Sequence, residues 1–190
     1  MTQKFQIKNM VCPRCIEAVE DIFTQLDYEI VQLVLGEITL EKNRLLSQVD
    51  IEQISTALEL RGFVLLQDKD AQIVNQIKSL VIEWIHHEKK QPNVKNSVFL
   101  SEKLQLSYSV LSKLFSRQEG TTLEKYIIAQ RIERVKELLS YKEKTLNQIS
   151  FDLGYSSVQH LSKQFKTVVG MSVTKYKKQQ LQNRKMLTEL

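Results

Sequence analysis

SYSVLSKLFSRQEGTTLEKY (residues 107–126) and SVQHLSKQFKTVVGMSVTKY (residues 157–176) follow one pattern, set fifty positions apart in this chain. Eight of the twenty aligned positions are identical, where unrelated helical sequences would share about one or two. In each copy a Leu and a Phe four residues apart form one apolar helix face, and the Ser and Lys after the Leu point elsewhere. A Gly five residues past the Phe ends the helix. The repeat predicts two similar helices, each with a polar surface for a target.

Each repeated helix follows a shorter one, an order that predicts two helix-turn-helix motifs. In the second copy the short helix covers residues 147–153, and Ser156 or Ser157 caps the next helix. In the first copy, residues 100–106 lead and residues 108–118 follow. The second helix of such a motif enters the major groove of DNA, so its outward side chains are expected to contact double-stranded DNA. These side chains are Ser109, Ser112, Lys113 and Arg117 in the first copy, and Val158, Gln159, Ser162, Lys163 and Lys166 in the second.

The second half of the chain resembles the DNA-binding domain of AraC-type transcriptional regulators, a bacterial class. The resemblance rests on GYSS (154–157), HLSKQFK (160–166), GMSV (170–173), KYK (175–177) and the linking-helix segment RIERVKELL (131–139). It covers about residues 76–178, and it departs at Ser150, where the family usually has Ala, and at Thr174, where Pro is common. It implies an all-α domain of about seven helices, with two reading helices in successive major grooves on one DNA face.

The distribution of charge separates two parts of the chain. Residues 1–70 contain 7 Lys and Arg against 12 Asp and Glu, whereas residues 71–190 contain 20 against 10. The basic part suits a polyanion such as DNA, and the acidic part does not. We therefore expect a sensor domain at residues 1–67, a linker at 68–75, a DNA-binding domain at 76–178 and a basic polar tail at 179–190.

The acidic part is expected to form an α+β domain of the ferredoxin-like βαββαβ fold. Alternating apolar residues predict strands from Lys4 and from Phe63, and two more strands on either side of Gly36. Apolar residues at helical spacing predict helices around residues 16–26 and 51–60. Strand, helix, strand, strand, helix, strand over roughly 65 residues fits a split βαβ unit.

Both cysteines of the chain, Cys12 and Cys15, lie in the loop that follows the first of these strands. Pro13 suits the first turn of a helix, so Cys15 falls where the helix dipole and free amide groups favour a thiolate. Two thiolates suit a soft cation such as Cu(I), whereas a closed Zn site normally has four ligands. The pair is too closely spaced for the disulfide framework of a secreted protein.

The spacing M-x-C-x-x-C, with Arg61-Gly62-Phe63 after the second helix, resembles the heavy-metal-associated domains of copper chaperones and metal-transporting ATPases. That resemblance implies that Cys12 and Cys15 are metal ligands, that Met10 packs beneath the loop and that Phe63 covers the site. Pro13 and Arg14 stand where that family has small or polar residues. Cu(I) is the preferred metal, with Zn(II) or Hg(II) as alternatives, and two chains could share one ion as a homodimer.

Other interpretations stay open at this point. The cysteine pair could sense thiol oxidation instead of metal, or the first domain could only mediate contacts. The chain could also be a metal-delivery protein whose helical half binds a protein partner. Thioredoxin-type catalysis is disfavoured because the only proline outside the cysteine loop is Pro92.

No pattern typical of an enzyme is present: there is no phosphate-cradling Gly loop and no nucleophile–base pair. His86 and His87 are expected to face solvent at a helix end, His160 to lie near DNA or at a domain boundary, and Trp84 to pack in a core. No stretch approaches the ~18 apolar residues of a membrane span, and a signal peptide is not apparent, so a cytoplasmic protein is expected.

Overall fold

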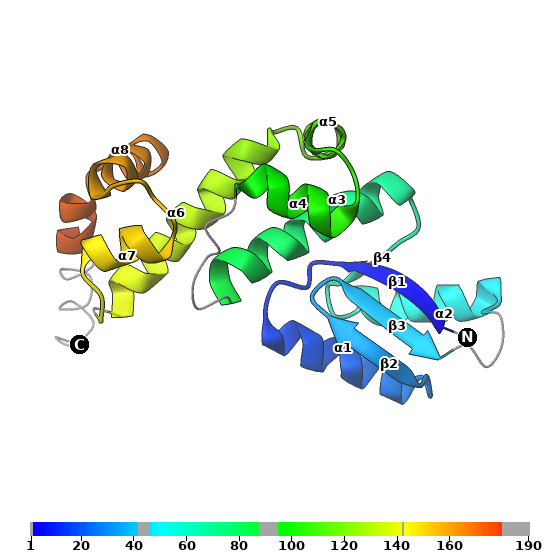
Figure 1. The fold of residues 1–190 in the computed structure, drawn as a ribbon. Coiled ribbons are helices and arrows are strands. Elements are labelled where there is room, and N and C mark those ends of the chain that lie inside the picture. The colour runs from blue at the N-terminus through cyan, green and yellow to red at the C-terminus, as the bar shows by residue number, and fades with distance from the viewer. Residues whose placement is uncertain (1, 42–45, 88–94, 142, 180–190) are drawn as a thin grey trace, which may run out of the picture. The chain divides into compact units, whose positions relative to one another are not determined.

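The computed structural model describes residues 2–41, 46–87, 95–141 and 143–179. The chain divides into two compact units, shown in Figure 1. Unit 1 is formed by residues 1–83 together with 97–122, and unit 2 by residues 84–96 together with 123–190. Unit 1 thus contains the first helix-turn-helix together with the sheet.

Unit 1 contains a four-stranded antiparallel sheet with the strand order β2-β3-β1-β4. Its elements are, in chain order, β1 (Thr2–Lys8), α1 (Pro13–Gln25), β2 (Ile30–Val34), β3 (Glu37–Glu41), α2 (Gln48–Glu59) and β4 (Val64–Leu66). This order of strands and helices is the one that the apolar spacing predicts. Ile7 and Ile38 from the sheet pack with Val19 of α1 and Leu58 of α2, and all four side chains are fully buried. This core holds α1 and α2 against the sheet.

Helix α3 (Lys69–Ile82) occupies the segment 68–75 that was expected to be a linker. The expectation rested on the charged run at Asp68 to Asp70, but Asp68 is the N-cap residue and accepts a hydrogen bond from the backbone N–H of Ala71 at 2.7 Å. Acidic side chains at a helix N-terminus stabilise the helix through its dipole. These residues therefore begin a helix, which a π-helical turn, η1 (Glu83–His87), continues.

The first helix-turn-helix consists of α4 (Asn96–Leu104) and α5 (Tyr108–Glu119), and α5 packs against α3. The remaining helices belong to unit 2. They are α6 (Leu123–Tyr141), α7 (Leu146–Asp152) and α8 (Val158–Val169), followed by a helical segment at residues 173–179.

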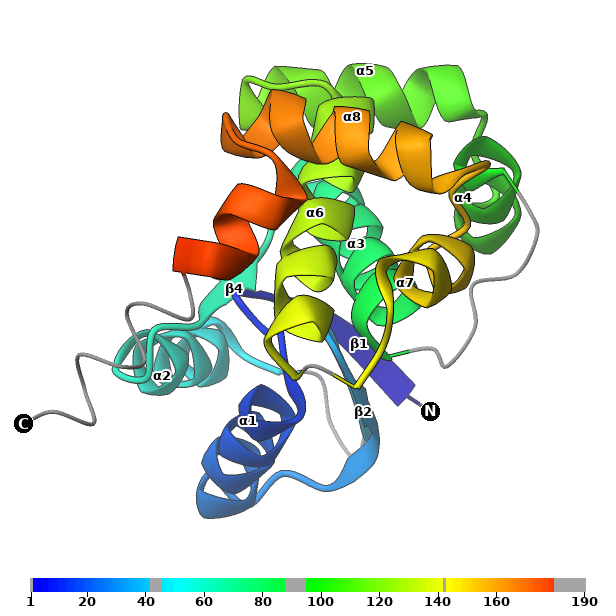
Figure 2. The same cartoon turned by 90° about the vertical axis from the view of Figure 1, so that its left-hand side faces the viewer.

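Helices α7 and α8 of unit 2 pack against α6 and against each other, as Figure 2 shows. Thr145 and Gln148 form a capping box at the start of α7, and Gly154 has φ +68° in the turn before α8. The core contains Ile149 of α7 and Phe165 of α8, both fully buried. In the described part of the chain, no helix is both long enough and apolar enough to cross a membrane. The basic tail expected at 179–190 lies, apart from its first residue, outside the described residues.

Candidate nucleic-acid interface and metal site

The two repeated segments form helices of equal length with equivalent ends. α5 and α8 each contain 12 residues. Ser107 and Ser157 are the N-cap residues, and the hydroxyl oxygen of each accepts a hydrogen bond from the backbone three residues later. At the other ends, Gly120 and Gly170 adopt the left-handed conformation, with φ 66° and 79°. The sequence repeat is therefore also a structural repeat.

Burial of the apolar face determines which side chains point outward on α5 and α8. The paired residues Leu111 and Phe115 of α5, and Leu161 and Phe165 of α8, are fully buried. Six of the nine expected DNA-contacting residues are exposed, namely Ser109, Lys113 and Arg117 on α5 and Gln159, Lys163 and Lys166 on α8. Ser112, Val158 and Ser162 are partly buried. All nine lie on the two candidate reading helices, and their contact with DNA stays a prediction.

The cationic side chains of these helices differ in their present partners. Arg117 forms an ion pair with Asp70 of α3. In the regions that the structure describes, Lys113, Lys163 and Lys166 take part in no ion pair. These three ammonium groups can meet phosphate or base edges directly, whereas Arg117 has to exchange a carboxylate for DNA.

A polar cluster at the start of α8 was only partly anticipated. The hydroxyl group of Ser156 lies 3.1 Å from Nδ1 of His160, and the ring of Tyr155 meets the His160 ring edge-on at 5.5 Å. The Tyr155 hydroxyl donates to Oε1 of Gln164 at 2.7 Å, and burial raises the pKa of Tyr155 to about 12. The cluster fixes the turn against α8. In the sequence, Tyr155 directly after Gly154 is the feature that could have indicated this cluster.

The structure places Cys12 and Cys15 side by side and buries Met10 and Phe63 in the core of unit 1. Cys12 is the N-cap residue of α1, and its Sγ lies 3.3 Å from Sγ of Cys15 in the first turn. Both thiols are free and partly exposed. Cys15 packs against the same core that buries Met10 and Phe63. The Sγ of Cys15 also lies 3.9 Å from the carbonyl oxygen of Asn9.

The environment of Cys15 favours a thiolate. Burial opposes ionisation, but backbone hydrogen bonds at Val11 and Cys12 and the side chain of Cys12 outweigh it, so the pKa of Cys15 is lowered. Sulfur–metal bonds of about 2.3 Å place two ligand sulfurs at most about 4.6 Å apart, so this pair can reach one ion. No group of three or more His, Cys, Asp or Glu side chains suited to a metal occurs among the described residues. Two soft ligands fit Cu(I) better than a closed Zn site.

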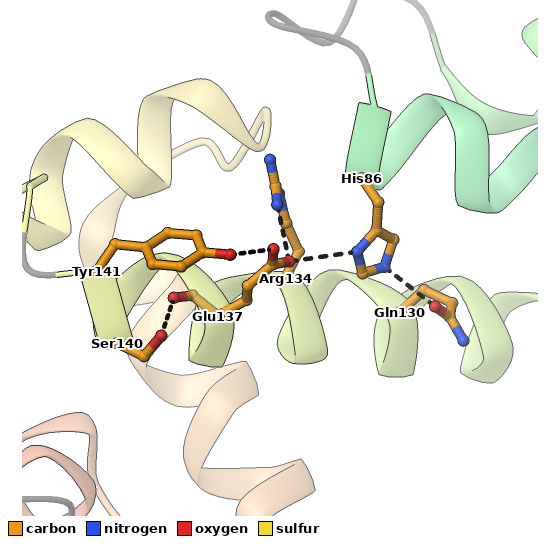
Figure 3. Close-up of polar contacts among 6 residues, drawn as sticks. All are labelled: His86, Gln130, Arg134, Glu137, Ser140 and Tyr141. Carbon is orange, nitrogen blue, oxygen red and sulfur yellow. Dashed lines mark hydrogen bonds and ion pairs between the residues drawn. The ribbon is translucent and has the colours of Figure 1, made fainter. Parts of the chain in front are cut away.

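His86 is not solvent-facing, contrary to the expectation from the sequence. Figure 3 shows its ring between two residues of α6: Nε2 lies 3.2 Å from Oε1 of Gln130, and Nδ1 lies 3.6 Å from Oε2 of Glu137. Glu137 also pairs with Arg134 at 2.7 Å and accepts a hydrogen bond from the Tyr141 hydroxyl at 2.9 Å. Burial lowers the pKa of His86, although Gln130 and Glu137 oppose the shift. The side chain of His87 lies outside the described residues.

Trp84, expected in a core, is buried, and the guanidinium carbon of Arg131 lies 5.6 Å from the centroid of its ring. Arg131 is largely buried as well, and burial lowers its pKa. One of its amino groups donates to Oδ1 of Asn96 at 2.9 Å. This contact and the His86 contacts join η1 and the start of α4 to α6 inside unit 2. They have a structural role there.

Two capped helices that each follow a shorter helix and expose polar and basic side chains define the helix-turn-helix class of DNA-binding domain. Residues 100–179 match the family described as "Helix-turn-helix domain". The chain is 27% identical over 150 residues to the "Probable transcriptional regulator LumQ" of Photobacterium leiognathi, covering 78% of this chain and 58% of that protein. It is 32% identical over 106 residues to the "Msm operon regulatory protein" of Streptococcus mutans, covering 56% of this chain and 36% of that protein. The chain thus spans little more than half of the first relative and about a third of the second.

Solved structures show the same fold. The C-terminal domain of AraT, a response regulator from Geobacillus stearothermophilus, superposes with a TM-score of 0.50 at 21% identity, covering 59% of this chain and 88% of that one. A Chromobacterium violaceum regulator with an AraC-type DNA-binding domain superposes with a TM-score of 0.50 at 23% identity, covering 57% and 92%. Residues 100–179 therefore form a helix-turn-helix domain with the fold of AraC-type DNA-binding domains. These relatives are regulators and not enzymes, as expected from the sequence.

Proposed function

We propose that this chain is a transcriptional regulator that binds a specific DNA sequence through α5 and α8 and responds to a soft metal ion held by Cys12 and Cys15. The observation that carries the DNA-binding part is the structural repeat. Two helices with the same caps, the same buried Leu–Phe pair and an outward Lys at the same position suit two similar surfaces, such as successive major grooves. The match of residues 100–179 and the named regulators among the relatives support the same function.

A sensing role for the first part of the chain is supported by the cysteine loop and by the fold of the domain that carries this loop. The order β-α-β-β-α-β and the strand order β2-β3-β1-β4 agree with a ferredoxin-like, heavy-metal-associated domain. Two thiols 3.3 Å apart at the start of α1 can bind one soft ion. Cu(I) is the first candidate ligand, followed by Hg(II) and Zn(II).

Thiol oxidation is the second candidate signal, and the same geometry favours it. The two sulfur atoms are close, and the lowered pKa of Cys15 increases the thiolate fraction at neutral pH. Oxidation would join both sulfurs in a disulfide, with two electrons and two protons passing to an added disulfide reagent. A metal-delivery role with a protein-binding helical half finds less support, since the helical half matches a DNA-binding class.

A titration of the reduced protein separates these functions. Under anaerobic conditions, Cu(I), Hg(II) and Zn(II) are added in turn while binding to a selected operator is followed by fluorescence anisotropy. We expect Cu(I) to change DNA affinity by about 5- to 150-fold, the usual range of coupling between two sites. A change caused only by a mild disulfide reagent would replace metal by oxidation as the signal. A chain that binds Cu(I) but no DNA would support metal delivery instead.

The first prediction concerns the double variant Cys12→Ser, Cys15→Ser. It should fold and bind DNA with the affinity of the parent, because neither thiol lies in the helix-turn-helix domain. Its affinity should no longer respond to Cu(I) or to a disulfide reagent. As a matched control, Ser55→Ala on α2 removes a partly buried hydroxyl group of the same unit and should keep the response. A double variant that responds as the parent does would place the sensing site elsewhere.

A further inference from the structure

One buried side chain, Asn75, fastens helix α3 to the sheet of unit 1. Its Nδ2 lies 3.2 Å from each of three acceptors: the side-chain oxygen of Gln6 and the backbone carbonyl oxygens of Ile7 and Gly36. The Asn75 side chain is only 6% exposed. An amide group has two N–H donors, so the three acceptors share them. Loss of a buried donor shared by three carbonyl groups carries a desolvation penalty, so this contact holds α3 in one position.

The turn between β2 and β3 also meets α3 at very close range. A Cβ atom at Gly36 would lie 2.2 Å from Oγ of Ser79 and 2.9 Å from Nδ2 of Asn75. A side chain at this position would require Ser79 and Asn75 of α3 to shift. Gly36 also has φ +79°, a conformation that favours glycine. The backbone of the β2–β3 turn therefore lies directly against α3 at Gly36.

A different part of α3 contacts the reading helix α5. Lys78 of α3 pairs with Glu119 of α5 at 2.5 Å, and Asp70 of α3 pairs with Arg117 of α5. The two helices also pack against each other. Helix α3 thus touches the sheet through Asn75 and the first reading helix through its ion pairs. The second reading helix, α8, belongs to unit 2.

The cysteine pair lies a short distance along the chain from this anchor. The anchored carbonyl group of Ile7 is at the end of β1, two residues before Asn9. Asn9 has φ +78°, its side chain donates to the carbonyl oxygen of Gly62 at 2.8 Å, and its own carbonyl oxygen faces Sγ of Cys15. Hydrogen bonds thus hold both ends of this short segment, so a change at Cys15 can shift the anchored end of β1.

We propose that Asn75 transmits the state of the cysteine pair to α5, so that the signal acts on the half of the DNA site read by the first helix-turn-helix. The proposal rests on the proposed function and gives the route by which its signal reaches DNA. A ligand changes DNA affinity only if it favours one arrangement of a reading helix over another. Helix α3 provides that link, since it is packed on the sheet and on α5 within one compact unit.

The test compares the full-length variant Asn75→Ala with Gln76→Ala, which removes an amide group one position along the same helix. The first readout is the ratio of operator affinities with and without Cu(I), together with a footprint of each half-site. Parent and Gln76→Ala should show a ratio of about 5 to 150, with altered protection in the half-site read by α5. Asn75→Ala should bind Cu(I) as the parent does but give a ratio near one. A full response in Asn75→Ala, or altered protection only in the α8 half-site, would overturn the proposal.

A second readout separates this proposal from the proposed function. Amide hydrogen exchange without metal or DNA should rise several-fold in residues 108–119 of Asn75→Ala relative to Gln76→Ala, and should stay unchanged in residues 158–169. Unchanged exchange in 108–119 would refute the link even if Cu(I) acts. If neither Cu(I) nor an oxidant changes the DNA affinity of the parent, the sensing function is refuted. Raised exchange in residues 108–119 of Asn75→Ala would still show that Asn75 links the sheet to α5. If Asn75→Ala does not fold, Gly36→Ala disturbs the same contact from the sheet side and takes its place in both readouts.

Discussion

Lys113 and Lys163 occupy equivalent positions on α5 and α8, and both ammonium groups are exposed. Arg117 stands on the same outward surface but is paired with Asp70. Exposed ion pairs contribute little stability, because solvent screens them and two long side chains lose freedom. The pair therefore costs little to exchange for a phosphate contact. On α5, Arg117 would therefore have to leave Asp70 before it contacts DNA, whereas Lys113 would not.

Gln159→Ala tests the reading surface of α8. If the amide group hydrogen-bonds a base edge, its loss should cost about 1–3 kcal/mol at the cognate site and relax the preference at one base pair. Binding to random DNA should hardly change. Thr167→Ala, an exposed change on the same helix, serves as control. Affinity is measured by anisotropy on both DNAs, and equal losses on cognate and random DNA would show that this surface does not read bases.

The partly buried His86 makes the stability of unit 2 depend on pH, and the direction of this dependence follows from its pKa. Burial lowers the pKa of His86 in the folded chain, while the unfolded value is about 6.5. The stability that its neutral form contributes is therefore present above pH ~6.5 and is lost as the pH falls through the folded-state pKa. The facing carboxylate of Glu137 also has a lowered pKa, so its own contribution is lost only below its ordinary value of 4.5.

His86→Gln should flatten the fall in stability below pH ~6.5, because glutamine keeps a polar side chain and does not titrate. Urea unfolding at several pH values, with far-UV circular dichroism as the signal, measures this. Thr167→Ala, an exposed change in the same unit that removes no titrating group, is the control. If the two variants showed the same pH dependence, the burial of His86 would have no thermodynamic effect.

At the scale of the element, the reading helices owe their length to their caps. Ser at the N-cap supplies an acceptor for a free backbone N–H, and Gly after the last turn takes the left-handed conformation. Gly120 and Gly170 have open space where a Cβ would stand, so a substitution there meets only backbone strain. At Gly36 the same substitution also meets Ser79.

Three glycine variants separate backbone strain from steric overlap. Gly120→Ala and Gly170→Ala should each lower stability by about 1 kcal/mol, from the left-handed conformation alone. Gly36→Ala should cost clearly more, because Ser79 and Asn75 of α3 would also have to shift. Thermal unfolding of the three variants measures the order. A cost for Gly36→Ala no larger than for the other two would mean that the contact with α3 is loose.

At the scale of the whole molecule, charge is divided unevenly along the chain. Residues 71–190 hold ten more basic than acidic residues, and residues 1–70 hold five more acidic than basic residues. If the basic part meets two grooves as proposed, it would neutralise several phosphates and release their counterions. The acidic part adds repulsion that a ligand-driven change could strengthen or relieve.

The logarithm of DNA affinity should therefore fall linearly with the logarithm of salt concentration, with a slope near −0.9 for each phosphate contacted. Lys166→Gln, at an exposed position late in α8, should reduce the slope by about one such unit on cognate and random DNA alike. Lys8→Gln, on the sheet of unit 1, is the matched control and should leave the slope unchanged. A flat salt dependence for the parent would exclude a phosphate-based interface.

The sequence alone was sufficient for the features that depend on local interactions. The two helix-turn-helix motifs, the end of α5 close to Gly120 and the order of strands and helices before α3 follow from apolar spacing and from Ser and Gly caps. These signals act between residues three to five positions apart, so a linear pattern contains them. The cysteine pair at the start of α1 also follows from spacing and from Pro13 at the first helical turn.

Only the tertiary structure decided which distant residues meet inside each unit. Asn75 reaches Gln6, 69 positions away, and Arg117 reaches Asp70, 47 positions away. The burial of His86 depends on Gln130, 44 positions away. Such contacts depend on which surfaces pack together, and a linear pattern does not contain that information. The charged run at Asp68 to Asp70 would look the same in a linker as in the first turn of a helix. Packing alone therefore made α3 a structural bridge from the sheet to the first reading helix.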